Sequence, residues 1–465
     1  MRRGWLRAVL PLTLAMAIAA CGGTPGEDTS NTDTGNEADS AAVKTDGFED
    51  LGDVTLKVVS SEGSGGPRDA IRELTKEFEA KYPNVTVDVQ FRDFASWIKQ
   101  ARLAAAGDDP PDVFAGNQGY QLDGELVKAG LILPLDKYSE AYGWEESFTP
   151  ETLQQFSWGD EGATFGEGTL YGVAQTGQSV GVFANKKKLD AAGVDPATLE
   201  TFDDFQDALA TLRESLPADE PVVALGNKDQ YGAIHLWGGI QGAYTPAQDI
   251  RDWIFHKEGA TFDTEGNLKS LQVLKEWADK GYLGQGDSFN ARNDSEAAAA
   301  FGKGEGAMVI GGNWNAATAR DGLGEDAIFF NMPPGESGDA VAIGSASVPM
   351  HISSKSENPD LAAAYIDFIT GPDAGQALVD TAQVPAATDT TAEPPDQLGK
   401  DVKAGWDGLV ESGGLTLYPD WSSPTMLQTM GQTFQEMLAG RIPPEEVVQK
   451  TQEDWEEYDA QLSEG

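Results

Sequence analysis

Apolar and polar residues alternate along DVTLKVVS, residues 53–60, which is the period-two pattern of a strand with one buried face. After the turn-rich SEGSGGP, apolar residues recur at helical spacing in RDAIRELTKEFEAKY, so a helix is predicted over residues 68–82. VTVDVQF predicts a second strand, residues 94–106 a second helix, and DDPPDVF the start of a third strand. This alternation indicates an α/β domain with mostly parallel strand pairing.

The same pattern continues along the rest of the chain, with one segment of a different kind. LYGVAQTGQSVGVFANKKKL, residues 170–189, predicts two strands around a polar turn. Further helices are predicted after Thr201 in DPATLETFDDFQDALATL, over 265–280 and 295–301, from Asn358-Pro359 onward, and over 423–440 and 443–462. No internal sequence repeat is present.

The glycine-rich stretch FGKGEGAMVIGGNW, residues 301–314, allows two interpretations. A phosphate-binding loop needs GxxxxGK[ST] between a strand and a helix, so that backbone N–H groups point at the anion. Here Gly304 follows Lys303, and the glycines precede the apolar run. We therefore expect AMVIGG to be a buried strand that ends at Trp314, at the carboxyl end where open α/β sheets bind ligands. A flat indole suits the apolar face of a sugar ring, although a lone Trp is often a core residue.

The N-terminus has the layout of a secretory signal peptide: three arginines, an apolar run over 8–20 and small residues before Cys21. The apolar run is too short for a transmembrane helix. IAAC at 18–21 resembles a bacterial lipobox, in which Cys21 is acylated after cleavage; the alternative is a free cysteine after an ordinary signal peptide. Cys21 is the only cysteine of the chain, so it cannot form an internal disulfide.

The segment from Gly22 to about Asp50 is polar and has almost no apolar residue before Phe48, which predicts a disordered tether. The remaining chain exceeds the usual size of one hydrophobic core, so two lobes are expected. The formal net charge is −44, from 76 acidic and 32 basic residues. This charge argues against nucleic acid and anionic membranes as partners. It could attract a cationic ligand, but the carboxylates are spread along the whole chain and need only be a solvated surface.

Taken in order, several segments resemble the extracellular solute-binding proteins of ABC sugar importers, the maltose-binding-protein class. The glycine-rich stretch with its upstream Ala-rich helix, AIRELTKEFEAKYPNVTVDV, DDPPDVFAGNQG, LYGVAQTGQSVGVFANKKKLDAAGV, ENPDLAAAYIDFITGPDAGQALV and LAGRIPPEEVVQKTQEDW carry the likeness. It spans about Asp53–Tyr458. One departure is Ala184 where the family's YNK turn has Tyr, and the loop Asn290–Asn293 matches nothing in the family.

The resemblance implies a two-lobed periplasmic-binding-protein fold of class II type, each lobe a mostly parallel sheet flanked by helices. Three hinge crossings are expected near 173–178, 342–347 and 415–418. The expected division is a signal peptide at 1–20, the lipidated cysteine and tether at 21–50, a first lobe of 53–174 with 347–415, and a second lobe of 175–343 with 418–462. Closure of the lobes on a ligand would bring aromatic side chains together from distant segments.

The resemblance also suggests which residues contact the ligand. Three aromatic candidates are Trp314, Trp237 in HLWGG and Trp421 in YPDWSS, with core packing as the alternative for Trp237. The polar candidates are Asn117 and Gln118 in AGNQG, Gln178 in the first crossing, Glu62 and Ser64 after the first strand, Ser345 in the second crossing, and Asp287. Aromatic residues at three such loops favour a carbohydrate over amino acids or ions.

Two other functions stay open. An exported glycoside hydrolase would need a carboxylate pair, and nothing singles out one among 76 acids; His235, His256 and His351 have no metal-ligand spacing, and no GxSxG is present. A polyamine-binding protein of the same fold would need carboxylates beside its aromatic residues, and only Trp421 has one next to it, Asp420.

The favoured function is therefore that of a non-enzymatic substrate-binding lipoprotein. It would capture a carbohydrate, an oligosaccharide by preference, and deliver it to the transmembrane subunits of an ABC permease. We expect a monomer with no metal, cofactor or nucleic acid, held by Cys21 on the outer face of the bacterial cytoplasmic membrane.

Overall fold

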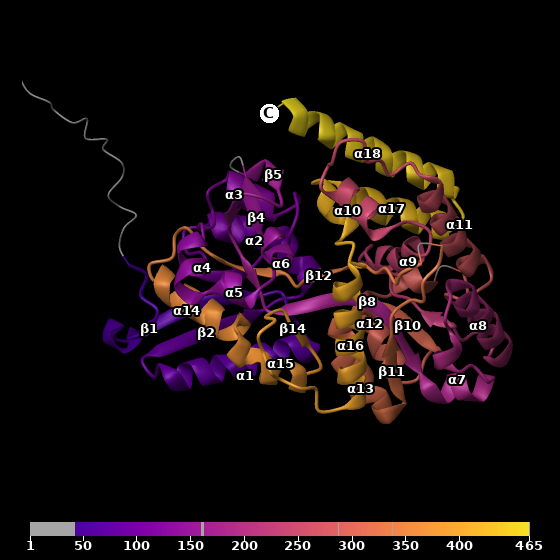
Figure 1. Ribbon diagram of the computed structural model, residues 1–465, viewed down its shortest axis with the longest axis horizontal. Helices are drawn as coiled ribbons and strands as arrows, with labels where there is room; N and C mark the ends of the chain where they lie inside the picture. The colour runs from indigo at the N-terminus through magenta and orange to yellow at the C-terminus, as the bar shows by residue number, and fades with distance from the viewer. Residues whose placement is uncertain (1–41, 160–161, 287, 337, 465) are drawn as a thin grey trace, which may run out of the picture. The chain divides into compact units, whose positions relative to one another are not determined.

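The computed structural model describes residues 42–159, 162–286, 288–336 and 338–464. The described chain from Val43 onward forms one compact unit, in which helices surround two principal β-sheets (Figure 1). No helix within these ranges has the length and apolar content that a bilayer crossing requires. The predicted signal peptide and the predicted lipidation site, Cys21, lie outside the described residues.

The first sheet begins as the sequence predicts. β1 (Val54–Ser60) is parallel to β2 (Val85–Phe91) and to β3 (Val113–Ala115). β13 (Pro349–Ile352) then pairs antiparallel with β3 and with β7 (Val173–Ala174). The prediction of mostly parallel pairing is wrong here. β13 and β7 do not belong to a strand–helix–strand repeat; they connect the two sheets, and both β13 pairings are antiparallel.

The second sheet is organised around one long strand, β8 (Thr176–Asn185), all ten residues of which are buried. Four strands pair antiparallel with β8, and β9 pairs parallel with β10, so this sheet is also mixed. The polar turn expected inside residues 170–189 is wrong: TGQS belongs to β8, where flanking strands use its backbone groups. The other strands of this sheet are β10 (Met308–Gly312), β11 (Ala327–Phe330), β12 (Gly344–Ala346), β14 (Val384–Pro385) and β9 (Val223–Ala224). A small antiparallel sheet contains β4 (Ser157–Gly159), β5 (Thr164–Phe165) and β6 (Thr169–Leu170).

The predicted helices all form, with ends that local chemistry explains. α2 (Phe94–Ala106) begins where the Asp93 carboxylate accepts the Ser96 N–H, and α8 (Phe202–Ser215) begins at a reciprocal capping box between Thr201 and Asp204. The remaining α-helices are α1 (Gly65–Lys81), α3 (Asp123–Lys128), α4 (Asp136–Tyr142), α5 (Trp144–Ser147), α6 (Pro150–Gln154), α7 (Lys186–Ala192), α9 (Gly232–Gly242), α10 (Ala247–Ile254), α11 (Glu265–Asp279), α12 (Asp294–Gly302), α13 (Ala316–Leu323), α14 (Pro359–Thr370), α15 (Gly375–Asp380), α16 (Gln397–Ser412), α17 (Met426–Leu438) and α18 (Pro444–Glu464).

The three segments expected to connect the lobes lie beside one another. The chain leaves the first sheet at the end of β7 and enters the second at the start of β8. β12 pairs with β8 just before β13 returns to the first sheet, and the third segment joins through a bridge between Leu415 and Ala342. Backbone hydrogen bonds therefore tie all three connecting segments together.

Two expected boundaries need correction. Helix α16, assigned above to the first lobe, packs against β11 and α13 of the second, with Leu398 and Val402 in a shared core with Phe183 and Phe329. Trp406 of the same helix lies over Gly177 of β8, where an added Cβ would come within 2.4 Å of the indole. The charged residues of KDVKAGW, residues 400–406, suggest an exposed segment. Val402 and Trp406 nevertheless pack it against the second lobe.

The tether predicted to extend to about Asp50 is also wrong at its end. Phe48 is fully buried in the 3-10 turn η1 (Phe48–Leu51), edge-on to Tyr82 at 5.5 Å. The Asn84 amide donates to the carbonyl of Phe48, and the Lys44 N–H donates to Asp360. Phe48, near the end of this polar stretch, therefore joins the core of the first lobe.

A buried His351–Asp123 ion pair connects β13 with the first residue of α3. His351 Nε2 lies 3.1 Å from Asp123 Oδ1, both side chains are about 1% exposed, and Asp123 also accepts the Asn117 N–H at 2.8 Å. On the other side of the ring, His351 Nδ1 lies 2.7 Å from the Tyr171 carbonyl.

Replacing His351 with Leu is expected to lower the free energy of unfolding by about 3–5 kcal/mol, because it leaves the Asp123 carboxylate buried without its partner. The measurement is urea denaturation followed by circular dichroism. As a control, Lys57→Ala removes an exposed ion pair and should leave stability nearly unchanged. Similar effects of the two substitutions would contradict the prediction.

Candidate functional site

Four aromatic residues and one histidine from distant segments meet between the two lobes. We name Tyr231, His235, Trp314, Tyr418 and Trp421 the aromatic cluster. The His235 ring is edge-on to Trp314 at 5.6 Å and to Tyr418 at 5.7 Å, and it contacts Tyr231 at 5.5 Å. Tyr418 in turn lies 5.2 Å from Trp421. The cluster thus joins α9, the turn after β10 and the segment after the third crossing.

The backbone is strained immediately before both tyrosines of the cluster. Gln230 has φ 76° and Leu417 has φ 67°, in the left-handed region that side chains other than glycine rarely occupy. Strain of this kind persists only where surrounding contacts hold it, and it is enriched at ligand sites. Near Gln230 that contact is the Asn227 side chain, which accepts the Ala233 N–H at 3.0 Å in the first turn of α9.

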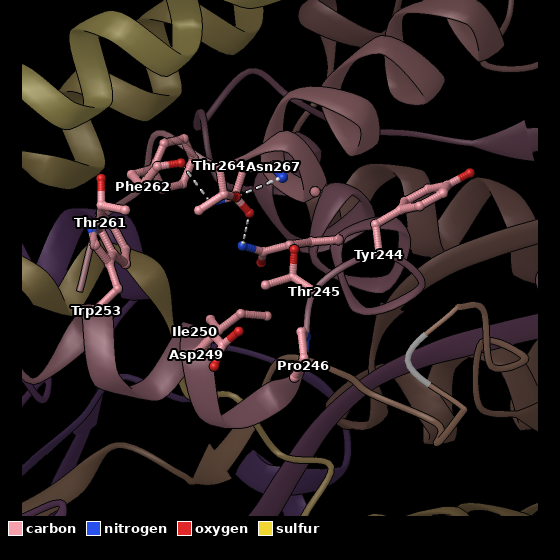
Figure 2. A pocket seen from close by; sticks show the side chains of 12 residues that line it. Tyr244, Thr245, Pro246, Asp249, Ile250, Trp253, Thr261, Phe262, Thr264 and Asn267 are labelled. Carbon is pink, nitrogen blue, oxygen red and sulfur yellow. Dashed lines mark hydrogen bonds between the residues drawn. The ribbon is translucent and has the colours of Figure 1, made fainter. Parts of the chain in front are cut away.

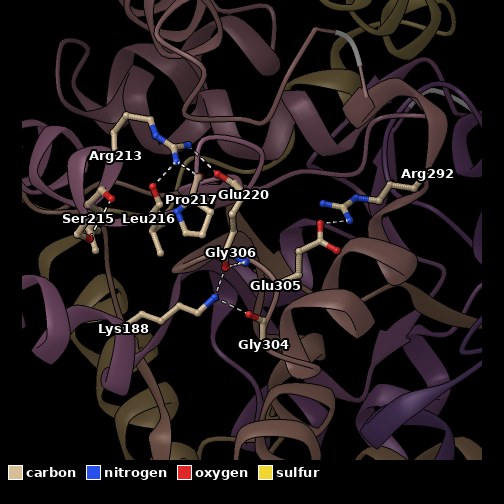
Figure 3. A network of polar contacts seen from close by, with 11 residues as sticks. Lys188, Arg213, Ser215, Leu216, Pro217, Glu220, Arg292, Gly304, Glu305 and Gly306 are labelled. Carbon is tan, nitrogen blue, oxygen red and sulfur yellow. Dashed lines mark hydrogen bonds and ion pairs between the residues drawn. The ribbon is translucent and has the colours of Figure 1, made fainter.

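Trp314 reaches the cluster as the sequence predicts, directly after the buried strand β10 and within η5 (Asn313–Asn315). The backbone groups of the glycine-rich turn before β10 bond to side chains of the protein (Figure 3). Lys188 contacts the Glu220 carboxylate and donates to the Gly304 carbonyl, and Glu220 accepts the Gly306 N–H at 3.0 Å. Arg292 pairs with Glu305 at 2.6 Å. This turn therefore fixes the start of β10 and offers no phosphate cradle.

Three carboxylates lie within electrostatic range of Tyr418: Glu62, Asp294 and Asp420, which we name the acidic group. All three act electrostatically on the Tyr418 hydroxyl, and with burial they raise its pKa. Glu62 follows β1 of the first lobe, Asp294 begins α12 and Asp420 lies in η8 (Pro419–Ser422). The acidic group is therefore assembled from both lobes.

Burial governs the ionisation of these side chains. It raises the pKa of Glu62 to about 7 and that of Asp420 to about 6. Burial also raises the pKa of Asp294, against hydrogen bonds from the Asn315 and Trp314 side chains that stabilise its carboxylate. It lowers the pKa of His235 to about 4, so this imidazole is neutral at physiological pH.

Several polar groups of the cluster are buried without a hydrogen-bond partner in the described part of the chain. They include Nδ1 of His235, a residue only 7% exposed, and the hydroxyl oxygen of Tyr418. A buried polar atom of this kind costs about 1–3 kcal/mol unless something bonds to it. Such atoms indicate where a ligand with hydroxyl or amino groups would bond.

Of the polar candidates, those in AGNQG lie beside the cluster. The Gln118 amide donates to the carbonyls of Ala346 and Ser347 at 3.0 Å each, which ties this loop to the second crossing. Asn117 is buried just before it. The next residues contact the cluster directly, since the Tyr120 N–H donates to the Trp421 carbonyl at 3.3 Å.

The crossing residues Gln178 and Ser345 are direct partners in the β8–β12 ladder. Ser345 is almost fully buried, and its hydroxyl donates to the Ala346 carbonyl at 2.6 Å, which indicates a structural use of this side chain. Glu62 and the buried Ser61 line a small cavity of about 20 Å³ with Thr176 and Ser347 of the crossings. That volume is about the size of one water molecule.

The sequence candidates that the structure removes or leaves aside are three. Trp237 is fully buried, donates to the Ser270 hydroxyl at 2.8 Å and packs on Phe262 and Phe434, so the prediction of a ligand contact is wrong. The glycine pair behind it serves helix packing in α9. Ser64 is exposed at the N-cap position of α1 without capping it, and Asp287 lies outside the described residues.

Sequence reasoning missed Tyr231, His235 and Tyr418 as members of the site. Tyr231 is the N-cap of the apolar, glycine-rich α9 and His235 lies within this helix, whose residues are buried all round and give no amphipathic signal. Tyr418 stood at the expected end of the third crossing and three residues before Trp421, which was the available signal. Phe94 of α2 meets Tyr231 edge-on at 6.3 Å, so the first lobe also reaches this wall.

A second cavity, of about 220 Å³, lies wholly within residues 241–267 of the second lobe (Figure 2). Trp253, Phe262, Thr245 and Asn267 line it, and Asn267 is held by hydrogen bonds from Gln241 and to the Phe262 carbonyl. No predicted site residue is among its lining. Within the described ranges, no group of three or more His, Cys, Asp or Glu is arranged to hold a metal ion.

Replacing Glu62 with Gln is expected to raise the free energy of unfolding at pH 8 by about 1–3 kcal/mol and to change it little below pH 5. The folded-state pKa of about 7 exceeds the ordinary 4.5, so the folded protein binds more protons between these values. The penalty for the buried charge is thus complete only above pH 7. Urea unfolding at pH 5 and pH 8 measures it, with the exposed Glu73→Gln as control. An equal effect at both pH values would contradict the assignment.

Comparison with known proteins places this geometry in a family. The family model for bacterial extracellular solute-binding proteins matches residues 62–376, which is more than half of the chain. An uncharacterised ABC-transporter extracellular-binding protein of Pyrococcus horikoshii is 23% identical over 258 residues, and the match covers 54% of each chain. The chain therefore aligns with about half the length of that curated relative.

Solved structures show the same fold. A chitin oligosaccharide binding protein superposes with a TM-score of 0.73 and 23% identity, covering 88% of this chain and 99% of its own. The GacH receptor of Streptomyces glaucescens gives a TM-score of 0.69 at 17% identity, covering 87% and 98%. The two-lobed α/β fold expected from the sequence is confirmed, with mixed sheets in place of mostly parallel ones. The chain belongs to the bacterial extracellular solute-binding proteins.

Proposed function

We propose that this protein is the substrate-binding lipoprotein of an ABC importer, which captures a carbohydrate between its lobes and delivers it to a membrane permease. The observation that carries the proposal is the aromatic cluster of the second lobe with its unpartnered buried polar atoms, which meets the first lobe at Phe94 and Tyr120. Trp314 and Tyr418, which are only partly buried, offer flat apolar faces that suit the C–H faces of sugar rings, whereas Trp421 is 3% exposed and packs behind Tyr418. The acidic group and the buried amides around them can bond to hydroxyl groups.

The names of similar structures support a carbohydrate. They include a chitin oligosaccharide binding protein, a receptor complexed with acarbose, a receptor with a preference for β-D-galactopyranose and a protein complexed with raffinose. An oligosaccharide is favoured here, because Trp314 and Tyr418 both flank His235 and each could stack one sugar ring.

The proposed mechanism is non-covalent. Closure of the lobes places the carboxylate of Glu62 from the first lobe and that of Asp294 from the second around one ligand. Because closure buries the ligand, the aromatic faces and the acidic group act in a medium with little water, where each contact is stronger. The closed form is then the shape that the permease recognises. No cofactor and no bond cleavage is part of this proposal.

The lobe boundaries remain part of the proposal: a first lobe of about 43–174 with 347–396, and a second of 175–343 with 397–462. We further propose that Cys21 carries a lipid, that the protein acts as a monomer on the outer face of the cytoplasmic membrane, and that its partners are the transmembrane permease subunits. A polyamine ligand and a glycoside hydrolase are the alternatives that the experiments below test.

Trp314→Ala is expected to weaken binding of the cognate sugar at least about tenfold, equivalent to about 1.4 kcal/mol, because the stacking face is lost. The measurement is tryptophan fluorescence titrated with mono-, di- and oligosaccharides, polyamines and amino acids. Trp237→Phe is the matched control and should bind like the parent, since Trp237 is a core residue. Saturation by polyamines with no response to any sugar would overturn the proposal, and cleavage products in the sugar samples would favour a hydrolase.

Cys21→Ser is expected to move the protein from the membrane fraction to the medium or extract of the expressing bacteria. The physical reason is that an acyl chain contributes about 0.8 kcal/mol of membrane affinity per buried CH₂ group. Fractionation followed by immunoblotting measures the change. Unchanged membrane association of the variant would show that another part of the chain provides the anchor.

A further inference from the structure

A polar cavity of about 220 Å³ lies inside the second lobe, between the end of α9, helix α10 and the first turn of α11 (Figure 2). Direct contacts hold its walls together. The Gln241 amide of α9 donates to the Asn267 side chain of α11 at 2.8 Å. A Cβ on Gly266 would lie 2.5 Å from the Thr245 hydroxyl, so the first turn of α11 is seated closely on Thr245. None of the described residues that line this cavity belongs to the aromatic cluster or the acidic group.

Two side chains that line the cavity carry polar atoms without a hydrogen-bond partner in the described part of the chain. They are the Thr245 hydroxyl and the Trp253 indole N–H, on residues that are 6% and 3% exposed. Figure 2 shows these two side chains on opposite sides of the cavity. Their neighbours are bonded within the protein: the Thr264 hydroxyl accepts the Asn267 N–H at 3.1 Å, and the Asn267 amide donates to the Phe262 carbonyl at 2.8 Å. Because a buried polar atom without a partner is unfavourable, the two free atoms mark where a bound molecule would supply hydrogen bonds.

The charges around the cavity disfavour an ionic ligand. Its lining includes one carboxylate, that of Asp249, and Glu265 stands in the first turn of α11; both repel an anion. No lysine or arginine is among the described residues that line it. A cation could pair with Asp249, but it has no lone pair to accept the Trp253 N–H. A hydroxyl group both donates and accepts, so a neutral molecule with several hydroxyl groups can satisfy Trp253, Thr245 and Asp249 together.

The volume limits such a ligand to about one sugar ring. The 220 Å³ of the cavity corresponds to about seven water molecules at their share of liquid volume. Pockets that hold drug-sized ligands are larger, usually about 300–1,000 Å³. Apolar side chains complete the lining: the Trp253 and Phe262 rings lie 5.1 Å apart at 49°, together with Ile250. Polar atoms set among apolar ones match a pyranose, which carries hydroxyl groups at its edge and C–H groups on its faces.

We propose that this cavity is a second binding site, outside the interlobe cluster, which takes one neutral monosaccharide between the Thr245 hydroxyl, the Asp249 carboxylate and the Trp253 N–H. An oxygen of the sugar accepts the indole N–H, and its hydroxyl groups bond to the other two side chains. The two sites share helix α9, which carries His235 in the cluster and Gln241 at this cavity. The inference does not depend on the proposed function, because a sugar can occupy this cavity whichever ligand binds between the lobes.

Isothermal titration calorimetry at pH 7 on the protein and its variants tests this inference. The panel contains glucose, galactose, xylose and N-acetylglucosamine, with cellobiose as a disaccharide and inorganic phosphate and spermidine as ions. We expect at least one monosaccharide to show a binding component that Thr245→Val and Trp253→Phe each weaken at least tenfold, because each removes one hydrogen-bonding group. Trp314→Ala should leave that component within about twofold, and so should the control Thr211→Val, which removes an exposed hydroxyl on α8.

The stability of the unliganded variant separates a binding role of Thr245 from a structural one. Thr245→Val replaces an unbonded hydroxyl with a methyl group of similar size, so its midpoint of thermal unfolding should equal or exceed that of the parent. Circular dichroism follows the unfolding. A lower midpoint would mean that the hydroxyl bonds within the protein, and it would overturn the assignment.

The binding outcomes separate this site from the interlobe site. If no monosaccharide shows a component that responds to Thr245→Val, the second site is overturned. Binding that is lost in Trp314→Ala and kept in Thr245→Val also overturns it, while supporting the interlobe proposal. Phosphate or spermidine binding that Thr245→Val removes, or an equal loss in Thr211→Val, overturns the neutral-sugar assignment. A monosaccharide component that depends on Thr245 alone, with no sugar bound between the lobes, would support the second site and overturn the proposed function.

Discussion

The structure depends on the backbone pairing of β8. This strand is buried along its whole length, so each of its N–H and C=O groups needs a partner within the protein. β14 and β12 supply partners near Thr176–Ser179, and β10 and β11 supply them from Val180 to Asn185. One continuous strand therefore fixes the connecting segments at one end and the strand that leads to Trp314 at the other. The ligand wall and the hinge are parts of one hydrogen-bonded ladder.

The parts of the fold that the sequence predicted are those governed by local chemistry. The Thr201 capping box, the alternation in β1 and the helical spacing of α1 depend on residues a few positions apart, and all three predictions are confirmed. The β8 segment failed because Gly177 and Gln178 read as a turn, whereas partners far away in sequence hold them extended. The prediction of strand direction was wrong for the same reason. The strands that connect the lobes pair antiparallel with partners that are distant in the sequence.

Site residues could be predicted only where the local sequence around a single residue gave a signal. Trp314 follows a glycine-rich turn and a buried strand, and Glu62 follows the first strand, so both could be placed from order alone. Trp237 also stands next to glycines, which suggested a ligand contact. Phe262 and Phe434, which come from distant segments, enclose it instead. His235 could not be identified from the sequence. A histidine at a ligand site differs from an ordinary core histidine only in lacking hydrogen-bond partners, and those are visible only in the structure. Three-dimensional proximity, not residue type, defines this cluster.

Several features that lower the stability of the folded protein are gathered at the candidate site. Raised pKa values at Glu62 and Asp420, left-handed backbone at Gln230 and Leu417, and unpartnered atoms on His235 and Tyr418 all occur within one wall. Each is unfavourable in the free protein, and a suitable ligand relieves several of them together. Binding energy would then arise from relief of these penalties as well as from new contacts.

The first turn of α1 carries a consequence for protein engineering. A Cβ on Gly66 would come within 2.4 Å of the Thr381 carbonyl and 2.8 Å of the Gln383 amide, in the segment that leads into β14. The first turn of α1, which follows the loop that carries Glu62, is therefore seated directly on the segment before β14, with no space for a side chain between them. A library intended to change ligand preference should vary positions 62 and 64 and keep glycine at 66, because any larger residue there would displace the proposed binding loop and the segment before β14 together.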